Sequence, residues 1–443
     1  MTLTINPVVT LEGELRGPSD KSLTHRSYMF AAIANGISVV RDPLRGEDCE
    51  STLKCMQQLG LTHEWLSERE VRLTPPIKWL QPSQPLDCGN SGTTMRLLSG
   101  LLASRELDVT LIGDASLSKR PMKRIAVPLR LMGATVEGDT PPLHIVGGNL
   151  KGIHYESPVA SGQIKSCCLL AGLVANGVTT VTEPSLSRDH TERMLRAMGA
   201  HLIRSGDDAS TDSHDSMSSH RSHLPPSVSI HPTEHLEPFE FQVPADISSA
   251  AFMMVAAAIL PNSRLVLRDL SVNPTRTGIF DVFEQCSIPF EMGELRSELG
   301  EPVADVVIGA QPHLQPFVID GPLVPRLIDE IPVLAILATQ CEGISVIRGA
   351  KELRVKESDR IELMANGLRA MGANVETFED GMEISGPTAL KATRIDACLD
   401  HRIAMAFAIA GLVAEGQTEI EGADAIATSY PNFESDLMRL TIV

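Results

Sequence analysis

The sequence predicts a two-part α/β protein built from six similar repeats, each of which buries an alanine- and leucine-rich helix. Three observations support this: a recurring helix–strand pattern, a second helix that ends at glycine, and a polar stretch near the middle of the chain. At roughly 100–200 residues per domain, 443 residues correspond to two or three domains. Because six repeats exceed one hydrophobic core, we expect two halves of three repeats.

The recurring pattern has a polar start, an apolar helix, a stop at a small residue and a β-branched strand. It occurs six times, spaced by about 70–85 residues, at 19–40, 88–112, 157–181, 243–267, 325–347 and 399–420. This period is longer than the roughly 20–50 residues of common solenoid repeats. The helices are apolar nearly all round, so we expect them to lie inside, covered by sheets.

A second helix accompanies most copies of the pattern and ends at a glycine before another strand. Examples lie at 54–62, 129–136, 195–202 and 368–375. Glycine adopts a positive φ without penalty and therefore suits the C-cap position. From the residues alone, each repeat is predicted to run strand–helix–strand–strand–helix–strand.

The polar stretch covers residues 204–227 and is rich in Ser, Asp and His. Its composition predicts an exposed loop. We expect no metal site there, because His214, His220 and His223 are irregularly spaced. The chain is expected to cross between the halves just after this stretch, within 242–246.

Composition and charge exclude several classes of protein. With 56 acidic and 38 basic residues, the net charge is -18, which argues against a general nucleic-acid binder. The eight cysteines form no C-x-x-C pair, so we expect reduced, buried thiols in the cytoplasm. No signal-peptide pattern opens the chain, and the apolar run 250–260 is too short to span a bilayer.

Polar residues, many of them cations, amides and hydroxyls, gather where the apolar helices start. They include Lys21, Ser22, Arg26, Asn90, Arg96, Ser161, Gln163, Lys165, Asp246, Asp329, His401 and Arg402. A helix N-terminus presents unpaired N–H groups and partial positive charge, which suit phosphate or carboxylate. Helix capping explains any single set. Taken together, the six helix starts carry more cations and amides than helix capping requires. This favours anionic ligands that both halves enclose.

Two loops add further cations. Residues 113–124 contain Lys119, Arg120, Lys123 and Arg124, and residues 354–360 interleave Arg354, Lys356 and Arg360 with two acidic residues. On a helix, Lys356 and Arg360 would be unfavourable like-charged neighbours that a bound anion could relieve. An ordinary surface helix remains the alternative for this segment.

These motifs resemble the EPSP synthase family of the shikimate pathway. The matching stretches are DKSLTHR, GNSGTTMR, DASLSKRPM, ASGQIKS, SRDHTERM, LIDEIP, RVKESDR and LDHRIAM, in order from Gly17 to Phe433. The resemblance implies a two-domain inside-out α/β barrel with three βαβαββ-type units per domain. It also implies domain limits of 1–19 plus 244–443 and of 20–243.

The resemblance implies enolpyruvyl transfer by addition and elimination in an interdomain cleft. The 5-hydroxyl of shikimate 3-phosphate attacks C2 of phosphoenolpyruvate while C3 is protonated, and the tetrahedral ketal phosphate then loses phosphate. Both substrates are anions, which accounts for the cations. No metal, organic cofactor, nucleic acid or membrane is implied, and we expect a cytoplasmic monomer.

Residue roles follow from the matching motifs. As catalytic residues the resemblance implies Asp329 as acceptor of the 5-hydroxyl proton, Glu357 as acid toward C3, and Lys21. The residues implied for shikimate 3-phosphate are Lys21, Ser22, Arg26, Ser161, Gln163, Arg188, Asp329 and Lys356. Those implied for phosphoenolpyruvate are Lys21, Asn90, Gly92, Arg120, Gln163, Arg360 and Arg402. A helix-capping role for Asp329 stays open.

Glu357 poses an electrostatic problem, because nearby cations favour the ionised carboxylate and a general acid needs a proton. We hypothesise that bound anions neutralise these cations and let Glu357 take up a proton. Gly92 is expected to leave room for glyphosate in the phosphoenolpyruvate pocket.

The sequence departs from the family pattern at three places. The terminal segment 427–433 has Tyr430 and no lysine, Gly162 stands where some members have serine, and the stretch 204–227 is longer than expected. Two alternatives are weaker. A UDP-N-acetylglucosamine enolpyruvyl transferase would carry Lys-Asn at 21–22 and a cysteine in 114–122, and a non-catalytic repeat scaffold would not need Asp329, Glu357 and the cations.

Overall fold

The computed structural model describes residues 1–205 and 225–442. Most of the predicted loop, including the three histidines considered above, lies outside the described residues. The chain divides into two compact bodies. The first body comprises Met1–Thr24, Arg41–Cys49 and Gln242–Val443, and the second comprises His25–Val40 and Glu50–Phe241. The domain limits implied by the resemblance stay a prediction.

All six predicted apolar helices are present. They are α1 (Lys21–Ala31), α3 (Gly92–Ala103), α5 (Gly162–Gly172), α7 (Ile247–Ile259), α10 (Ile331–Ala338) and α12 (His401–Leu412). Every residue of α10 and α12 is buried, and in α7 all but Ile259 are. The prediction of helices buried on all sides is therefore confirmed.

A second set of helices follows the first in each repeat. These are α2 (Glu47–Gln58), α4 (Lys123–Met132), α6 (His190–Ala197), α8 (Gly278–Gln285), α11 (Arg360–Ala370) and α13 (Phe433–Leu440). Gly60, Gly133, Gly199 and Gly372 have φ values of 106, 111, 95 and 93° after α2, α4, α6 and α11. These are the left-handed conformations predicted for the glycines that end the second helices.

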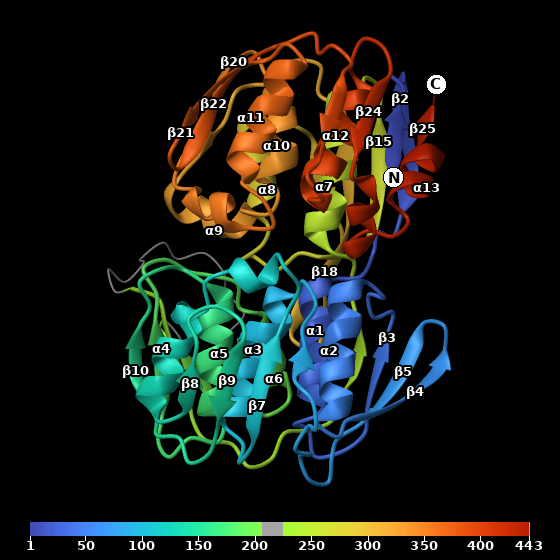
Figure 1. Ribbon diagram of the computed structural model, residues 1–443. Coiled ribbons are helices and arrows are strands. Elements are labelled where there is room, and N and C mark those ends of the chain that lie inside the picture. Colours follow the sequence, from blue (N-terminus) through green and yellow to red (C-terminus); the bar gives the residue numbers. More distant parts are fainter. Residues whose placement is uncertain (206–224, 443) are drawn as a thin grey trace. The chain divides into compact units, whose positions relative to one another are not determined.

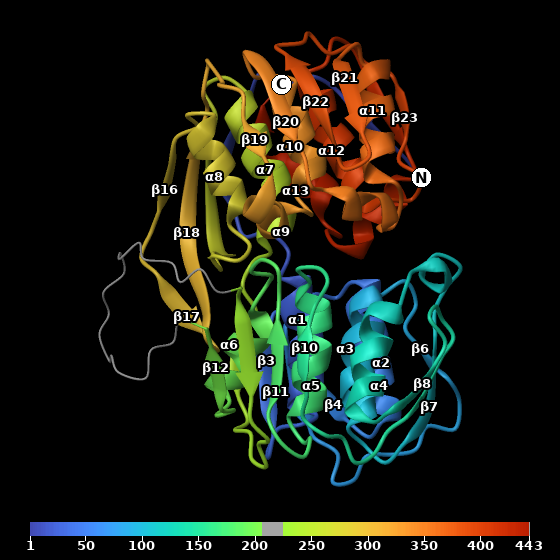
Figure 2. The ribbon, with the colours of Figure 1, turned by 90° about the vertical axis from the view of Figure 1, so that its left-hand side faces the viewer.

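The second body contains three four-stranded sheets. One has the order β14 (Glu240–Gln242), β3 (Ser38–Arg41), β5 (Glu70–Thr74), β4 (Thr62–Ser67). The next has the order β6 (Leu86–Asp87), β7 (Asp108–Ile112), β9 (Leu143–Val146), β8 (Thr135–Glu137). The third has the order β10 (His154–Glu156), β11 (Thr179–Thr182), β13 (Ser227–Ile230), β12 (Leu202–Arg204). Figure 2 shows α3, α4 and α5 inside this body, with strands on the outside.

The order of elements within a repeat corrects the prediction made from the residues alone. Along the chain the repeat reads β6, α3, β7, α4, β8, β9, so the second helix follows the second strand directly. Strands β6 and β7 are parallel around α3, whereas β8 and β9 form an antiparallel pair. Because adjacent antiparallel strands need only a short turn, both remaining strands follow α4. This is the βαβαββ order that the family resemblance implies.

The first body also contains three sheets. One has the order β1 (Thr2–Ile5), β24 (Thr418–Glu421), β23 (Arg394–Asp396). Another has the order β19 (Val318–Ile319), β20 (Gly343–Ile347), β22 (Gly381–Gly386), β21 (Asn374–Phe378). The six-stranded sheet runs β16 (Phe290–Met292), β18 (Glu301–Gly309), β15 (Arg264–Ser271), β2 (Thr10–Leu15), β25 (Thr441–Ile442), with β17 (Arg296–Glu298) also on β18.

Helices α7, α10 and α12 contact one another in the core of the first body. Figure 1 shows them, together with α11, between the strands β20–β22 on one side and β15–β2 on the other. This arrangement, with helices inside and sheets outside, brings several helix N-termini into one neighbourhood. Among the described residues, no helix combines the length and hydropathy needed to cross a bilayer.

The cysteines follow the prediction with one exception. Seven are buried, but Cys398 is exposed. Cys398 and Leu399 have φ values of 49 and 57° in the turn before α12. The tight left-handed turn places this side chain at the surface, so the prediction of a buried thiol is wrong at this position.

Candidate functional site

The Asp329 carboxylate, just before α10, is surrounded by cations of the first body. Its Oδ1 lies 3.4 Å from Lys356 Nζ, 3.5 Å from Arg360 Nη1 and 4.0 Å from Arg402 Nε. Arg402 Nη1 also donates a hydrogen bond to the Asp329 carbonyl oxygen at 3.0 Å. Four residues predicted for one site from separate motifs therefore lie together.

Arg360, at the start of α11, links this group to two more carboxylates. Its Nε lies 2.9 Å from Asp400 Oδ2, and its Nη2 lies 2.6 Å from Glu357 Oε2. Burial opposes the charge of Arg360, but Asp400 and Glu357 outweigh burial and raise its pKa. Asp400 also caps α12 by accepting a hydrogen bond from the Arg402 N–H at 2.9 Å. Sequence reasoning missed Asp400, although an Asp before an apolar helix is a helix-start signal.

Lys21, the first residue of α1, belongs to the same cluster. Its Nζ forms an ion pair with Asp48 Oδ2 at 3.1 Å. Burial tends to lower the pKa of Lys21, but the carboxylates of Asp48 and Glu357 outweigh burial and raise it above its ordinary value. Sequence reasoning missed Asp48 as well, because nothing in the stretch around it marks an acidic residue as functional. We call Lys21, Asp329, Lys356, Glu357, Arg360, Asp400 and Arg402 the Asp329 cluster.

His401, between Asp400 and Arg402, is an uncharged residue next to the Asp329 cluster. Burial, followed by the positive charges of Lys21 and Arg402, lowers the pKa of His401 to about 3. Its Nε2 has no hydrogen-bond partner among residues 1–205 and 225–442. At neutral pH its imidazole therefore adds no positive charge to that of the nearby Lys21, Arg402 and Arg360.

The second body holds a separate group of predicted residues around Gly92, at the start of α3. Arg120 donates hydrogen bonds to Asn90 Oδ1 and to Ser116 Oγ, and Asn90 Nδ2 donates to Asp114 Oδ2 at 2.7 Å. A Cβ on Gly92 would lie 2.9 Å from Arg96 Nη1 and 3.5 Å from Arg120 Nη1. Two guanidinium groups thus lie beside the bare backbone of Gly92.

Sequence reasoning counted Arg96 among the cations at the helix starts but assigned it to neither substrate. Its Nη1 donates a hydrogen bond to Gln163 Oε1 at 2.6 Å, and Gln163 Nε2 donates to Thr93 Oγ1 at 3.0 Å. Its position inside the matched stretch GNSGTTMR was the available signal. We call Asn90, Gly92, Arg96, Arg120 and Gln163 the Gly92 cluster.

The predicted residues for shikimate 3-phosphate in the second body lie near the start of α5. Ser161 caps this helix by accepting a hydrogen bond from the Ile164 N–H. Gly162 packs against Arg188, since a Cβ at position 162 would meet the Arg188 carbonyl oxygen at 3.0 Å. Arg26 is almost fully buried, and it donates hydrogen bonds to Thr191 Oγ1 at 2.9 Å and to Ser166 Oγ at 3.0 Å.

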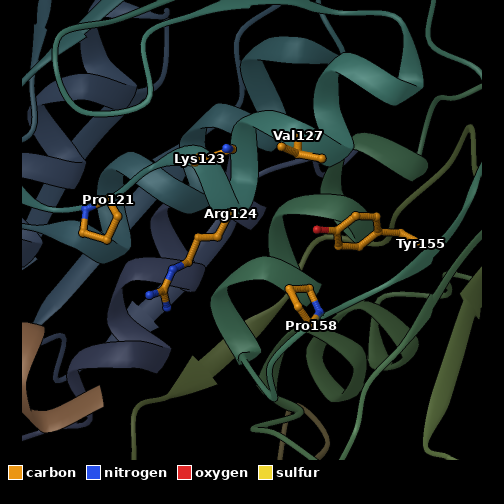
Figure 3. A pocket seen from close by; sticks show the side chains of 6 residues that line it. All are labelled: Pro121, Lys123, Arg124, Val127, Tyr155 and Pro158. Atoms are coloured by element: carbon orange, nitrogen blue, oxygen red, sulfur yellow. The ribbon is translucent and has the colours of Figure 1, made fainter. Parts of the chain in front are cut away.

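A pocket of about 400 Å³ lies elsewhere in the second body (Figure 3). It is lined by Pro121, Lys123, Arg124, Val127, Tyr155 and Pro158. None of the predicted site residues lines it. Within the described residues, no three His, Cys, Asp or Glu side chains gather in a way that would hold a metal ion.

Tyr430, which stands in the terminal segment where some family members have lysine, is a core residue. Its side chain is fully buried, and its ring packs edge-on against Phe433 with ring centroids 5.4 Å apart. Burial raises the pKa of its hydroxyl well above the ordinary value. Tyr430 is therefore placed to pack and not to attract an anion.

Comparison with known proteins identifies the family of this fold. The family model described as EPSP synthase (3-phosphoshikimate 1-carboxyvinyltransferase) matches residues 5–437. The 3-phosphoshikimate 1-carboxyvinyltransferase of Bacillus cereus strain AH187 is 46% identical, over 99% of this chain and 99% of the relative. That of Bacillus thuringiensis strain Al Hakam is also 46% identical, with the same coverage.

Solved structures show the same relationship. The EPSP synthase from Acinetobacter baumannii superposes with a TM-score of 0.85 at 42% identity, covering 100% of this chain and 98% of that one. The enolpyruvyl transferase NikO from Streptomyces tendae shares the fold, with a TM-score of 0.78 at 17% identity and coverage of 99% and 97%.

The fold is therefore that of the enolpyruvyl transferases, with helices enclosed by sheets in two three-repeat bodies. Within that class, the chain belongs to the EPSP synthase family and is a transferase of the shikimate pathway, acting as a 3-phosphoshikimate 1-carboxyvinyltransferase. The alternative of a UDP-N-acetylglucosamine enolpyruvyl transferase is not favoured.

Proposed function

We propose that the Asp329 cluster carries out the proton transfers of this reaction. Asp329 accepts the proton of the 5-hydroxyl of shikimate 3-phosphate as that oxygen attacks C2 of phosphoenolpyruvate. The cations around Asp329 stabilise its ionised form, which a proton acceptor requires. Lys356 binds shikimate 3-phosphate, and Arg360 and Arg402 bind phosphoenolpyruvate together with Lys21.

Glu357 is the proposed acid that protonates C3. Its contact with Arg360 at 2.6 Å favours the ionised carboxylate, so proton uptake requires that this contact weaken. An anionic phosphoenolpyruvate gives Arg360 another negative partner and thereby makes the proton on Glu357 less costly. When the tetrahedral intermediate expels phosphate, C3 returns a proton to Glu357 and the departing phosphate takes the former 5-hydroxyl proton from Asp329, which restores the enzyme.

The second body contributes the remaining substrate contacts in this proposal. Asn90, Gly92, Arg120 and Gln163 bind phosphoenolpyruvate, and the two guanidinium groups beside Gly92 support that role because phosphate and carboxylate suit arginine. Shikimate 3-phosphate is bound by Ser161, Gln163 and Arg188, by Lys21 and Ser22 at the start of α1, and by Arg26. Arg26 is almost fully buried, and in this proposal its guanidinium group supplies positive charge to the phosphate.

The observation that carries the proposal is the convergence of three cations within 4.0 Å of Asp329. Its test is phosphate release by the wild type, Asp329→Asn and Glu357→Gln. We expect release only with both substrates, and kcat lower by about 10²–10⁴-fold in each variant. Asp281→Asn, which removes a carboxylate paired with Arg326 in the same body, is the control and should stay within about twofold.

Each outcome discriminates between the candidate functions. Release with UDP-N-acetylglucosamine in place of shikimate 3-phosphate would support the related transferase, and no release by the wild type would support a scaffold. Full activity of Asp329→Asn or Glu357→Gln would disprove the proposed role of that residue.

We also propose that the enzyme acts as a monomer in the cytoplasm. Seven buried thiols suit a reducing compartment, which supports the location. Light scattering at micromolar concentration should give the mass of one chain, and fractionation of cells should place the activity with the cytoplasmic proteins. A dimer mass, or activity in another fraction, would refute the corresponding part.

A further inference from the structure

The second body contains a buried ion cluster that the reaction does not use. Lys165 Nζ on α5 lies 2.9 Å from Glu183 Oε2 and 2.9 Å from Glu192 Oε1. All three side chains are 2% exposed. Burial tends to lower the pKa of Lys165, but Glu192 and Glu183 outweigh burial and raise it, so this residue is charged at neutral pH.

Such a cluster is costly, because several charges leave water and two carboxylates share one lysine. Replacing buried ion pairs with apolar residues is often neutral or stabilising, so a contribution to folding alone is a weak reason to have one. The remaining contacts of Glu183 suggest another role.

Glu183 and Lys165 connect two segments of the second body. Glu183 Oε1 accepts a hydrogen bond from the Ser161 N–H at 2.9 Å and another from Ser187 Oγ at 2.6 Å. Lys165 Nζ donates to the Ser187 carbonyl oxygen at 3.3 Å. The Glu183–Lys165 pair therefore holds the start of α5 and the turn before α6 at a set separation.

Those two segments carry predicted contacts to shikimate 3-phosphate. Ser161 and Gln163 open α5, and Arg188 directly follows Ser187. Gly162 and Arg188 already pack closely, since a Cβ at 162 would lie 3.0 Å from the Arg188 carbonyl oxygen and 3.1 Å from the Arg188 Cβ. A small change in the distance between the two segments would thus displace the Ser161 hydroxyl and the Arg188 guanidinium group relative to each other.

We infer that Glu183 and Lys165 are positioning residues for shikimate 3-phosphate, an inference that rests on the proposed roles of Ser161 and Arg188. They touch no substrate themselves. They align the two segments that bind it, so their loss weakens binding of shikimate 3-phosphate more than binding of phosphoenolpyruvate.

Glu192 provides a matched control for Glu183. It contacts the same lysine at the same distance and is equally buried. Its Oε1 contacts Lys165, but its Oε2 has no hydrogen-bond partner within the described residues, so Glu192 lacks the bonds that Glu183 makes to the Ser161 N–H and to Ser187 Oγ. Glu183→Gln and Glu192→Gln therefore remove the same charge beside Lys165, but only the first also disturbs the hydrogen bonds to Ser161 and Ser187.

The experiment measures the Kd of shikimate 3-phosphate by calorimetry, the KM of phosphoenolpyruvate at saturating shikimate 3-phosphate, and the melting temperature. We expect Glu183→Gln to raise this Kd about tenfold and Glu192→Gln less than about threefold, with both melting temperatures lowered to a similar extent. The KM of phosphoenolpyruvate should stay within about twofold. Equal Kd values for the two variants, or an equal rise in both substrate constants, would overturn the inference.

A milder pair of variants covers the case in which Glu183→Gln does not fold. Ser187→Ala removes one hydrogen bond to Glu183, whereas Ser157→Ala removes a buried hydroxyl bonded to the Val159 carbonyl oxygen. We expect the first to raise the Kd about fivefold and the second to leave it unchanged. Ser161→Ala tests the proposed function itself. If this variant leaves the Kd of shikimate 3-phosphate unchanged, the start of α5 does not bind this substrate. If Ser161→Ala raises the Kd but Glu183→Gln and Ser187→Ala do not, only the positioning role is wrong.

Discussion

Lys21 Nζ lies 3.1 Å from Asp48 Oδ2, so the ammonium group predicted to bind phosphoenolpyruvate has a carboxylate partner of its own. Among the groups around Lys21, Asp48 does most to raise its pKa. Asp48→Asn should therefore lower this pKa, and Lys21 should lose its charge at a lower pH. We expect the alkaline decline of kcat/KM for phosphoenolpyruvate, followed from about pH 7 to 11, to move to lower pH.

The control for this prediction is Glu383→Gln, which removes a partly buried carboxylate paired with Arg348 in the same body. Its pH profile should match that of the wild type. If the alkaline decline of kcat/KM in Asp48→Asn occurs at the same pH as in the wild type, ionisation of Lys21 does not cause that decline.

Gly92→Ala should weaken binding in the proposed phosphoenolpyruvate pocket. The added Cβ would lie 2.9 Å from Arg96 Nη1, so the flexible guanidinium group would have to move. We expect glyphosate to inhibit the wild type competitively with phosphoenolpyruvate, and its inhibition constant to rise at least about tenfold in the variant. Gly17→Ala is the control, because no heavy atom lies within 4 Å of a Cβ there. Equal inhibition of Gly92→Ala and the wild type would place glyphosate elsewhere.

His401→Gln should make the protein less sensitive to acid. The pKa of His401 is about 3 in the folded chain against an ordinary 6.5, so below pH 6.5 the unfolded chain binds a proton that the folded chain does not. This difference favours unfolding as the pH falls, and by about pH 5 it costs about 2 kcal/mol. Urea unfolding at about pH 7 and pH 5 should show that the variant loses about that much less stability than the wild type. The same loss in both proteins would contradict the prediction, and the exposed His154→Gln serves as control.

Arg276→Met should strongly destabilise the first body. Arg276 is 2% exposed, and its guanidinium group lies 2.5 Å from Asp20 Oδ2 and 2.8 Å from Asp246 Oδ1. Removing it leaves two buried carboxylates without their cation, which costs about 3–5 kcal/mol. Arg268→Met is matched, since Arg268 also bridges two carboxylates but at the surface, and it should lose far less in the same denaturation experiment. Similar losses of stability in the two variants would show that burial does not determine how much Arg276 contributes to the free energy of unfolding.

Tyr430→Phe should leave catalysis unchanged. The hydroxyl is buried and the ring packs on Phe433, so we expect the KM of phosphoenolpyruvate to stay within about twofold. The free energy of unfolding should stay the same or rise slightly, because the buried hydroxyl has no hydrogen-bond partner among the described residues and its removal eliminates an unsatisfied polar group. A large rise in KM without loss of stability would mean that Tyr430 takes the place of the family's lysine.

The sequence was sufficient to predict the elements that depend on interactions between residues close together in the chain. Helix α12 was recognisable because apolar residues cover all its faces, and Gly133 was recognisable as a C-cap after LRLM. The order of strands within each repeat could not be predicted, because a short β-branched run does not show with which other strand it pairs. Pairing across the chain decides that order.

The site could be predicted only where a motif named its residues. Asp329, Glu357 and Arg360 came from LIDEIP and RVKESDR, and the structure places them together. Asp48 and Glu183 could not be found in this way, since their importance depends on cations at positions 21 and 165 that only folding brings near. The pairing of a carboxylate with a distant lysine leaves no local pattern in the sequence.

The close packing of Gly162 on Arg188 constrains how this enzyme could change over evolution. A serine at 162 would add a hydroxyl beside the proposed sugar phosphate, yet its Cβ would first meet the backbone of Arg188 at 3.0 Å. Such a substitution should be tolerated only after, or together with, a change that moves the 187–188 turn outward. We therefore expect positions 162 and 188 to be epistatic, so that Gly162→Ser alone is deleterious in this chain but is tolerated together with a change at position 188.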